Sequence, residues 1–288
     1  MNKTPFNKIL IGFAFSPNLK ANVFEAMRLA EFLGAHLYFL HVGSKSPAKA
    51  KTFSEILEES PVQPKNFTVL WDEGTPIETI SEQCKKNQID LLLLGAMQRE
   101  NMVKFYMGSI ARKLTRNAPC SVLLMIKPSV VRKPSQHFVV NAFESAETES
   151  TIRAAFHFAQ ALSATKLTLV EEIDRSEVAE EADDDRGLRK VTLRKEKLKR
   201  RELSRVREIL SHIPDTLKEN IKIHSQSIFG TRGYSIGHYA KVVRADLLIM
   251  NSDEKRKRFL ERIFPKDLEH ILSELPTDVL IIKSKENG

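Results

Sequence analysis

The sequence predicts an α/β protein made of two doubly wound domains in tandem. Three observations lead to this prediction. Short apolar runs alternate along the chain with helical patterns, which is typical of parallel sheets. The same order of elements recurs in the second half of the chain. The 288 residues also suit two domains, because a domain usually contains roughly 100–200 residues.

The first half begins with a strand, a helix and a second strand. Residues 8–15 form an apolar run that ends at turn residues. A helical pattern follows, with apolar side chains three and four positions apart: Val23, Ala26, Met27, Ala30 and Leu33. Gly34 stands where a C-terminal glycine ends a helix. Residues 37–42 form the next apolar run, which we predict to be the second strand.

Three more strands and two helices complete the first half. They are predicted as a strand at 67–71, a helix from Gly74-Thr75-Pro76 to about Asn87, a strand at 91–94, a helix at about 109–115 and a strand at 122–126. Residues 91–94 are four leucines without polar alternation, as expected for a strand that is covered on both faces.

The second half repeats these signals in the same order. Ala26, Ala30, Leu33 and Ala35 recur 129 residues later as Ala155, Ala159, Leu162 and Ala164; Gly74-Thr75 and Asp90 recur 156 residues later as Gly230-Thr231 and Asp246. Strands are predicted at 138–140, 167–170, 247–250 and 279–282. Several anchors in one order indicate a duplicated domain. We place the first domain at residues 1–127, the junction near 127–135 and the second domain at 136–285.

The second half also carries a charged insertion at about residues 171–207. The offset between the two halves grows by about 27 residues between the second and third strands. The segment opens with acidic side chains, from Glu171 to Asp185, and continues with basic ones, from Arg189 to Arg207. This order predicts a disordered acidic loop followed by a long surface helix that runs toward Leu210.

Composition favours a cytoplasmic protein without a membrane span. Cys84 and Cys120 are too few for a disulfide framework or a metal cluster, which suits a reducing compartment. No apolar run reaches the ~18–20 residues of a membrane-spanning helix. The formal net charge is +8, but we find no nucleic-acid-binding motif. Glu196, Glu202 and Glu208 interleave with the bases of the insertion, which argues against a pure phosphate binder.

A loop of the first half has the features of a phosphate-binding site. Gly95 follows the fourth strand, and Gly108-Ser109 precedes a helix. Parallel sheets bind ligands at the carboxyl ends of their strands. Glycine lets backbone N–H groups approach a phosphate, and a helix N-terminus adds free donors and a partial positive charge. Ser109 adds a hydroxyl and Lys104 a positive charge. The alternative is that both glycines serve only in turns.

The residues around this loop resemble the universal stress protein family in its UspA-like, tandem form. The hallmark of that family is Gly-x-x-Gly, nine residues, then Gly-Ser or Gly-Thr after a fourth strand. Further similarity lies in KILIGF, LAEFLGAHL, LHV, EGTPIETI and GSIARKLTRNAPCSVLLM. The resemblance implies an adenine nucleotide alpha hydrolase-like fold with a five-stranded parallel sheet in each half. It also implies pairing of the halves through their last strands, at 122–126 and 279–282.

The resemblance further implies ATP or a related nucleotide as a ligand, but the sequence departs from the family pattern. Where nucleotide binders of the family have an acidic residue after the first strand, this sequence has Ala14, and we assign Ala142 to that place in the second half. The middle glycine of the motif is Gln98, whose side chain hinders close approach of a phosphate. The site predicted for the first half consists of Val42 near the base or ribose, with Gly95, Gln98, Gly108 and Ser109. In the second half, Asn251, Glu254, Pro265 and Lys266 replace the motif residues, which predicts no site.

The remaining polar residues suggest neither a catalytic nor a metal site. His41 ends a strand, where a packed histidine is the favoured interpretation. The other histidines lack metal-ligand spacing. We find no nucleophile–base pair and therefore expect slow nucleotide hydrolysis at most. Gly230, Gly233 and Gly237 are interpreted as a flexible turn, and both cysteines as packing residues.

These observations lead to a main hypothesis and two alternatives. The main hypothesis is a cytoplasmic stress-response regulatory protein that binds a nucleotide in its first domain only. The first alternative is a scaffold that binds no nucleotide and recruits a protein partner through the charged insertion. Nucleic-acid binding through the basic stretch ranks last. Pairing of the two domains within the chain is expected, and a homodimer is left open.

Overall fold

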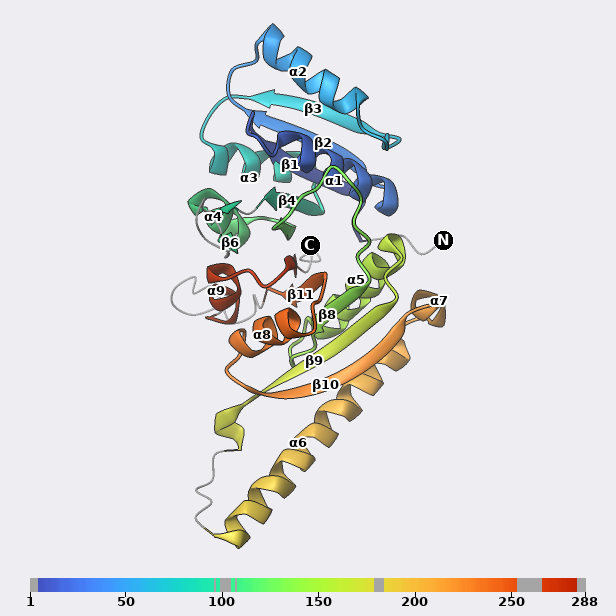
Figure 1. Cartoon of the computed structure of the whole chain (residues 1–288), viewed down its shortest axis with the longest axis vertical. Helices are drawn as coiled ribbons and strands as arrows, with labels where there is room; N and C mark the ends of the chain where they lie inside the picture. The colour runs from blue at the N-terminus through green and yellow to red at the C-terminus, as the bar shows by residue number, and fades with distance from the viewer. Residues whose placement is uncertain are drawn as a thin grey trace.

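The computed structural model describes residues 5–95, 97–98, 105–106, 108–178, 184–252 and 266–283. Its first half contains β1 (Lys8–Phe13), α1 (Leu19–Leu33), β2 (His36–Val42), α2 (Pro47–Glu58), β3 (Phe67–Asp72), α3 (Pro76–Lys86), β4 (Leu91–Gly95), β5 (Met97–Gln98), β6 (Phe105–Tyr106), α4 (Ser109–Asn117) and β7 (Ser121–Met125). Strands alternate with helices as the sequence predicts (Figure 1).

The second half has the same order with a longer middle part. It contains β8 (His137–Asn141), α5 (Thr148–Leu162), β9 (Lys166–Asp174), the 3-10 helix η1 (Arg175–Glu177), α6 (Asp185–His212), α7 (Asp215–Lys218), β10 (Lys222–Gly230), α8 (Tyr234–Val242), β11 (Leu247–Asn251), α9 (Lys266–Ser273) and β12 (Asp278–Ile282). The helix α6 stands between the second and third strands of its half, where the first half has the shorter α2.

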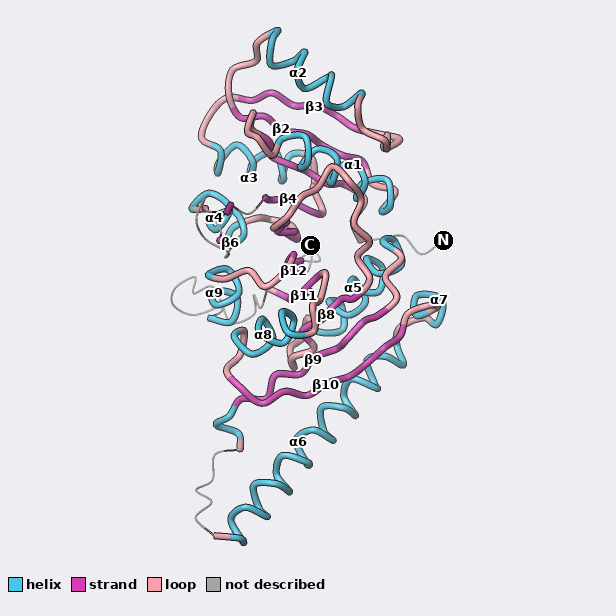
Figure 2. The backbone as a smooth tube through the Cα atoms, viewed as in Figure 1, coloured by secondary structure: helices cyan, strands magenta, loops and turns pink. Residues whose placement is uncertain are grey.

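Both halves contribute to one continuous sheet. The strand order is β10-β9-β8-β11-β12-β7-β4-β1-β2-β3, so each half has five strands in the same relative order. All neighbours within a half pair in parallel, whereas β12 and β7 pair antiparallel through Val279–Leu124, Leu280–Leu123 and Ile281–Val122. The pairing of the halves through their last strands is therefore confirmed (Figure 2).

Helices cover both faces of this sheet, which makes each half doubly wound. One apolar core joins the sheet to α1, α2 and α5, with buried residues such as Met27, Phe53 and Phe156. The other core joins the opposite face to α3, α4, α8 and α9, with buried residues such as Cys84 and Ile236. Residues of β4 alternate between the two cores, which explains why its run of leucines has no polar position.

Two aspartates show that the repeat extends to side-chain hydrogen bonds. Asp90 Oδ2 accepts the backbone N–H groups of Asn7 and Lys8 at 2.8 and 3.0 Å. Asp246 Oδ2 accepts those of Gln136 and His137 at 2.7 and 2.9 Å. Each aspartate thus ties the start of the first strand of its half to the start of the fourth, where the sequence alignment matches the two residues.

Two expectations about the second half were wrong. Glu171 and Glu172, expected in a disordered loop, belong to β9 and are buried, because β9 continues through Asp174. The pairings of Ile9 with Leu91 and of Phe138 with Leu247 also fix the register of the repeat. In this register Phe143, and not Ala142, is the counterpart of Ala14. The sequence alignment had shifted this position by one residue because the first strands share few anchors.

Candidate functional site

The candidate site lies at the carboxyl ends of the strands in the first half. Val42 is the last residue of β2 and Gly95 is the last residue of β4, with β1 between these two strands. Neighbouring strands are ~4.8 Å apart, so two strand spacings separate the two residues along this edge. Val42 is half-buried and Gly95 is exposed. The sheet thus brings together residues that are far apart in the sequence.

Gly95 faces the first turn of α1. A β-carbon at Gly95 would lie 3.4 Å from Oδ1 of Asn22, which is ordinary van der Waals contact. The same Oδ1 atom is buried and has no hydrogen-bond partner within the described part of the chain. The side chain of Asn22 therefore places an acceptor without a described hydrogen-bond partner beside Gly95. The sequence pattern did not indicate Asn22 as a site residue.

The segment between the two glycine positions contains a small hairpin. Met97 pairs with Tyr106 and Gln98 with Phe105 in antiparallel register. Gln98 thus belongs to a strand, whereas the family motif has a glycine at that position. Lys104, which the sequence suggests as a phosphate ligand, lies outside the described residues.

The N-terminus of α4 closes the candidate site. Gly108 is its N-cap residue and Ser109 its exposed first residue. Among the described residues, no side chain caps this end by a hydrogen bond, and the first turn contains no acidic residue. The free N–H groups and the positive end of the helix dipole can therefore receive an anion.

A cluster of aromatic rings forms the other end of this edge. His41 contacts the rings of Phe13, Phe15 and Trp71 at centroid distances of 5.3, 5.2 and 5.0 Å. Its Nδ1 donates to the carbonyl of Phe13 at 3.1 Å, and the residue is 7% exposed. His41 is thus a packed histidine, as the sequence suggests. Phe15 is 37% exposed and leaves an aromatic surface at the strand ends, which the sequence analysis did not identify.

The part of the chain that contains this site is similar in sequence to known proteins. The profile of the universal stress protein family matches residues 45–125, which include Gly95 and Gly108. A universal stress protein of Methanocaldococcus jannaschii is 26% identical over 123 residues, which covers 36% of this chain and 72% of that protein. Residues 45–125 of the chain thus resemble the universal stress protein family in sequence.

Solved structures show the fold of this family over the whole chain. A functionally unknown protein from Pseudomonas aeruginosa PAO1 has a TM-score of 0.69 at 17% identity and covers 98% of this chain and 94% of that one. A universal stress protein from Archaeoglobus fulgidus has a TM-score of 0.68 at 15% identity and covers 98% and 99% of the two chains. The α/β fold of the whole chain, with its two halves, is thus shared with these structures.

The second half closes the corresponding edge with its own carboxylate. Strand register places Glu172 where the first half has Val42, since the pairs Lys8–His36 and His137–Lys166 correspond. Glu172 is 4% exposed, and its two oxygens accept the backbone N–H groups of Gly233 and Ile236 at 3.0 and 2.8 Å. A fixed carboxylate therefore occupies the N-terminus of α8.

The insertion helix fills the space beside Glu172. Arg205 of α6 donates to the carbonyl of Ala142 and pairs with the carboxylates of Glu171 and Glu202. Burial, the largest influence, raises the pKa of Glu171 to about 8 although the charge of Arg205 opposes this shift. Burial also opposes ionisation of Glu202, but hydrogen bonds from Arg201 and Arg205 outweigh it and lower the pKa of Glu202.

A cavity of about 570 Å³ remains at this edge of the second half. Its charged lining consists of Glu144, Glu172, Asp174, Glu177 and Glu202 against Arg201 and Arg232. The guanidinium of Arg232 lies 3.9 Å from the ring centroid of Phe143, the counterpart of Ala14. Five carboxylates against two guanidinium groups disfavour a phosphate ligand. At Asn251, which ends β11, the side chain donates to Ser145 at 2.7 Å; Glu254 and Pro265 lie outside the described residues.

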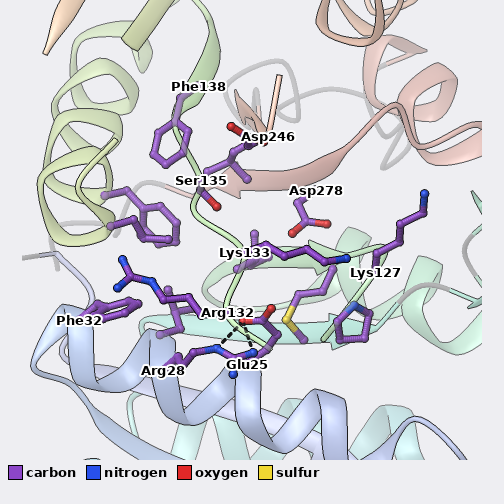
Figure 3. A pocket seen from close by; sticks show the side chains of 17 residues that line it. Glu25, Arg28, Phe32, Lys127, Arg132, Lys133, Ser135, Phe138, Asp246 and Asp278 are labelled. Atoms are coloured by element: carbon purple, nitrogen blue, oxygen red, sulfur yellow. Dashed lines mark hydrogen bonds and ion pairs between the residues drawn. The ribbon is translucent and has the colours of Figure 1, made fainter. Parts of the chain in front are cut away.

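A smaller cavity of about 80 Å³ lies where the two halves meet the connecting segment (Figure 3). Arg28 of α1 is 3% exposed and donates to the carbonyls of Ser129 and Val130, so it fixes this segment against the first half. Asp278 accepts the N–H of Ile126 at 2.8 Å, and burial raises its pKa to about 7. These contacts hold the junction of the halves; the cavity is too small for a nucleotide.

Three further findings concern other kinds of site. Cys84 and Cys120 are both buried free thiols. The described part of the chain holds no group of three or more His, Cys, Asp or Glu side chains arranged for a metal ion. It also holds no helix whose length and apolarity would suffice to span a bilayer.

Proposed function

We propose that this chain is a regulatory protein of the universal stress type that binds one adenine nucleotide, in its first half. The observation that carries the proposal is the open N-terminus of α4 at the carboxyl ends of the strands, which no side chain caps among the described residues. At the same edge of the second half, Glu172 occupies the N-terminus of α8, the counterpart of α3. An anion finds free donors in the first half and a fixed negative charge in the second.

In this proposal, different residues contact different parts of the nucleotide. The backbone at Gly95 and Gly108, with the hydroxyl of Ser109, holds the phosphates. Val42 lies against the base or ribose, and the exposed ring of Phe15 offers a surface on which a base can stack. Gln98 lies in β5, where the side chain replaces a glycine of the family motif, and we therefore expect weak binding.

In this proposal the protein acts by binding the nucleotide and does not hydrolyse it efficiently. His41, next to the end of β2, donates through Nδ1 to the carbonyl of Phe13 and lies within the aromatic cluster. Its packing removes it from the role of a general base, which needs hydrogen-bond reach to the attacking water. We expect at most slow hydrolysis of a bound nucleotide, in a cytoplasmic protein.

Calorimetric titration with ATP and magnesium tests the proposal. The expected result is one site per chain. Ser109→Asp places a carboxylate in the first turn of α4, which favours the helix dipole by about 0.3–1 kcal/mol but repels phosphate. Binding should weaken at least tenfold in this variant. Ser150→Asp, in the first turn of α5, makes the same chemical change in the other half and should leave binding unchanged.

Three outcomes would contradict the proposal. A flat titration at millimolar ATP would leave the scaffold alternative, in which the chain acts only through partners. Two sites per chain would refute the assignment to the first half. Equal weakening by Ser109→Asp and Ser150→Asp would show that the added charge, and not its position at α4, controls binding.

A further inference from the structure

The outer face of α6 carries a stripe of exposed basic side chains. The helix has 28 residues, and only Leu198, Glu202 and Val206 are buried. The three mark the face that packs on the second half, so the opposite face points to solvent. Figure 1 shows α6 running along β10, with its first turns extending past the end of the sheet.

Between Arg186 and Arg200, five cations lie on this outer face without an ion pair to any described residue. They are Arg186, Arg189, Lys190, Lys197 and Arg200, and all five are exposed. At 100° per residue they fall within about 100° of the helix circumference, opposite Leu198 and Glu202. The stripe covers about 21 Å of helix axis at 1.5 Å per residue. We refer to these five residues as the α6 stripe.

Of the three acidic side chains that interrupt the basic run in the sequence, the structure buries one and pairs a second with a lysine. Glu202 points inward, is 3% exposed and pairs with Arg205 and Arg201. Glu196 pairs with Lys199 beside the stripe at 3.4 Å. Periodicity places Glu208 on the outer face, two turns beyond Arg200. The outer surface is therefore more uniformly positive than the sequence suggests.

We propose that the α6 stripe binds the phosphate backbone of double-stranded DNA without reading its sequence. A helix with its side chains is about 10–12 Å across and fits the ~12 Å major groove of B-form DNA. The segment from Asp185 to Lys197 contacts the second half through Val191 and Arg194 and contains no buried residue, so its outer face is open to a groove. Arginines form three of the five cations, and their guanidinium groups suit phosphate oxygens.

Two features favour DNA over other anionic partners. A membrane-surface helix inserts an apolar face, but the apolar face of α6 packs on the protein through Leu198 and Val206. Leu193, 71% exposed, is the one large apolar side chain among the cations of the stripe within the described helix. The deep, narrow major groove of A-form RNA does not admit a helix. The inference is independent of the proposed nucleotide site.

Fluorescence anisotropy with a labelled DNA duplex of about 20 base pairs tests the inference on the full chain. Non-specific binding in the range of about 1–100 µM is expected at physiological salt. Five phosphate contacts predict a slope of about −4 to −5 for log K against log salt concentration. Alanine at all five stripe positions should weaken binding at least tenfold at low salt and bring the slope close to zero. Alanine retains the helix because it is the strongest helix former.

The matched control removes five exposed lysines from the first half: Lys45, Lys51, Lys65, Lys85 and Lys86. It has the same net charge as the stripe variant and should retain both affinity and slope. Circular dichroism of both variants should show an unchanged helix content. The inference is overturned if the wild-type chain does not bind the duplex, or if both variants weaken binding equally. It is also overturned if vesicles rich in phosphatidylserine or an RNA duplex compete as well as DNA.

Discussion

The carboxylate of Glu172 accepts the backbone N–H of Ile236 at 2.8 Å, across 64 positions of sequence. The same carboxylate accepts the N–H of Gly233, so one buried side chain caps the N-terminus of α8. Its counterpart Val42 in the first half offers no charge. This is one difference between the two copies of the repeat: the second half holds a fixed carboxylate at the end of its second strand, and the first half has an apolar side chain there.

Glu172→Gln should destabilise the protein. Glutamine offers one acceptor oxygen, and its amide group cannot accept the second N–H. We expect a loss of about 1–3 kcal/mol in the free energy of unfolding, the usual result of an unsatisfied buried donor. Urea denaturation measures it. Glu144→Gln, at an exposed carboxylate of the same cavity, is the control and should change stability by less than about 0.5 kcal/mol. Equal effects of the two variants would contradict the capping role.

Glu171→Gln should make stability less dependent on pH. The pKa of Glu171 is raised from 4.5 to about 8 in the folded protein. A raised folded-state pKa means that stabilisation is complete below the unfolded pKa and is lost as the pH rises through the folded pKa. This group therefore lowers wild-type stability progressively between pH 4.5 and about 8. Glutamine remains neutral and removes that contribution.

Urea denaturation at several pH values from about 5 to 9 checks this result, with the direction set by the linkage relation. The variant should gain stability relative to the wild type as the pH rises. Glu208→Gln, at an exposed position of α6, should leave the pH dependence unchanged. If the free energies of unfolding of the wild type and the variant differ by the same amount at every pH, the titration does not belong to Glu171.

Asp90→Ala and Asp246→Ala should destabilise the protein by similar amounts. Each change leaves two backbone N–H groups without their carboxylate acceptor. A loss of about 2–4 kcal/mol is expected for each, since hydrogen bonds to charged groups contribute about 1.5–3 kcal/mol. Thermal or urea unfolding measures both. If only one of the two variants lost stability, the side chains would not perform the same task in the two halves.

Cys84 and Cys120 should resist modification in the folded protein. A hydrogen bond with Cys120, followed by burial, raises the pKa of the Cys84 thiol far above its ordinary value. Both residues are at most 7% exposed, and the thiolate is the reactive form. An aromatic disulfide reagent should therefore react with neither thiol until denaturant is added, and then with two per chain. Rapid reaction of one thiol in the native protein would contradict this burial.

Much of the fold followed from local patterns. The alternation of apolar runs and helices, with Gly34 ending α1 at a φ of 63°, located most strands and helices of the first half within a few residues. The pairing of the last strands followed from the family resemblance. The helix α2 was missed because only Phe53 and Leu57 of its residues are buried, which leaves a weak apolar pattern. Acidic residues concealed the end of β9, since buried charges are rare without partners.

The candidate site was predictable only in part. Gly95, Gly108 and Ser109 stand out because glycines after a strand and before a helix form a recognisable motif. Asn22, Phe15 and Trp71 gave no such signal, since the tertiary fold alone brings them to the strand ends. Whether a nucleotide binds there stays a prediction.

The sequence by itself determined the duplicated strand–helix order and the position of the phosphate-type loop, because apolar periodicity and glycine placement are local properties of the chain. Only the tertiary structure decided which charges act on which site. In the folded chain, Glu172 caps the N-terminus of α8, and Arg205 pairs with Glu202 against the second half. The α6 stripe is exposed to solvent. The physical reason is that the effect of a charge depends on its burial and on neighbours that are distant in the sequence.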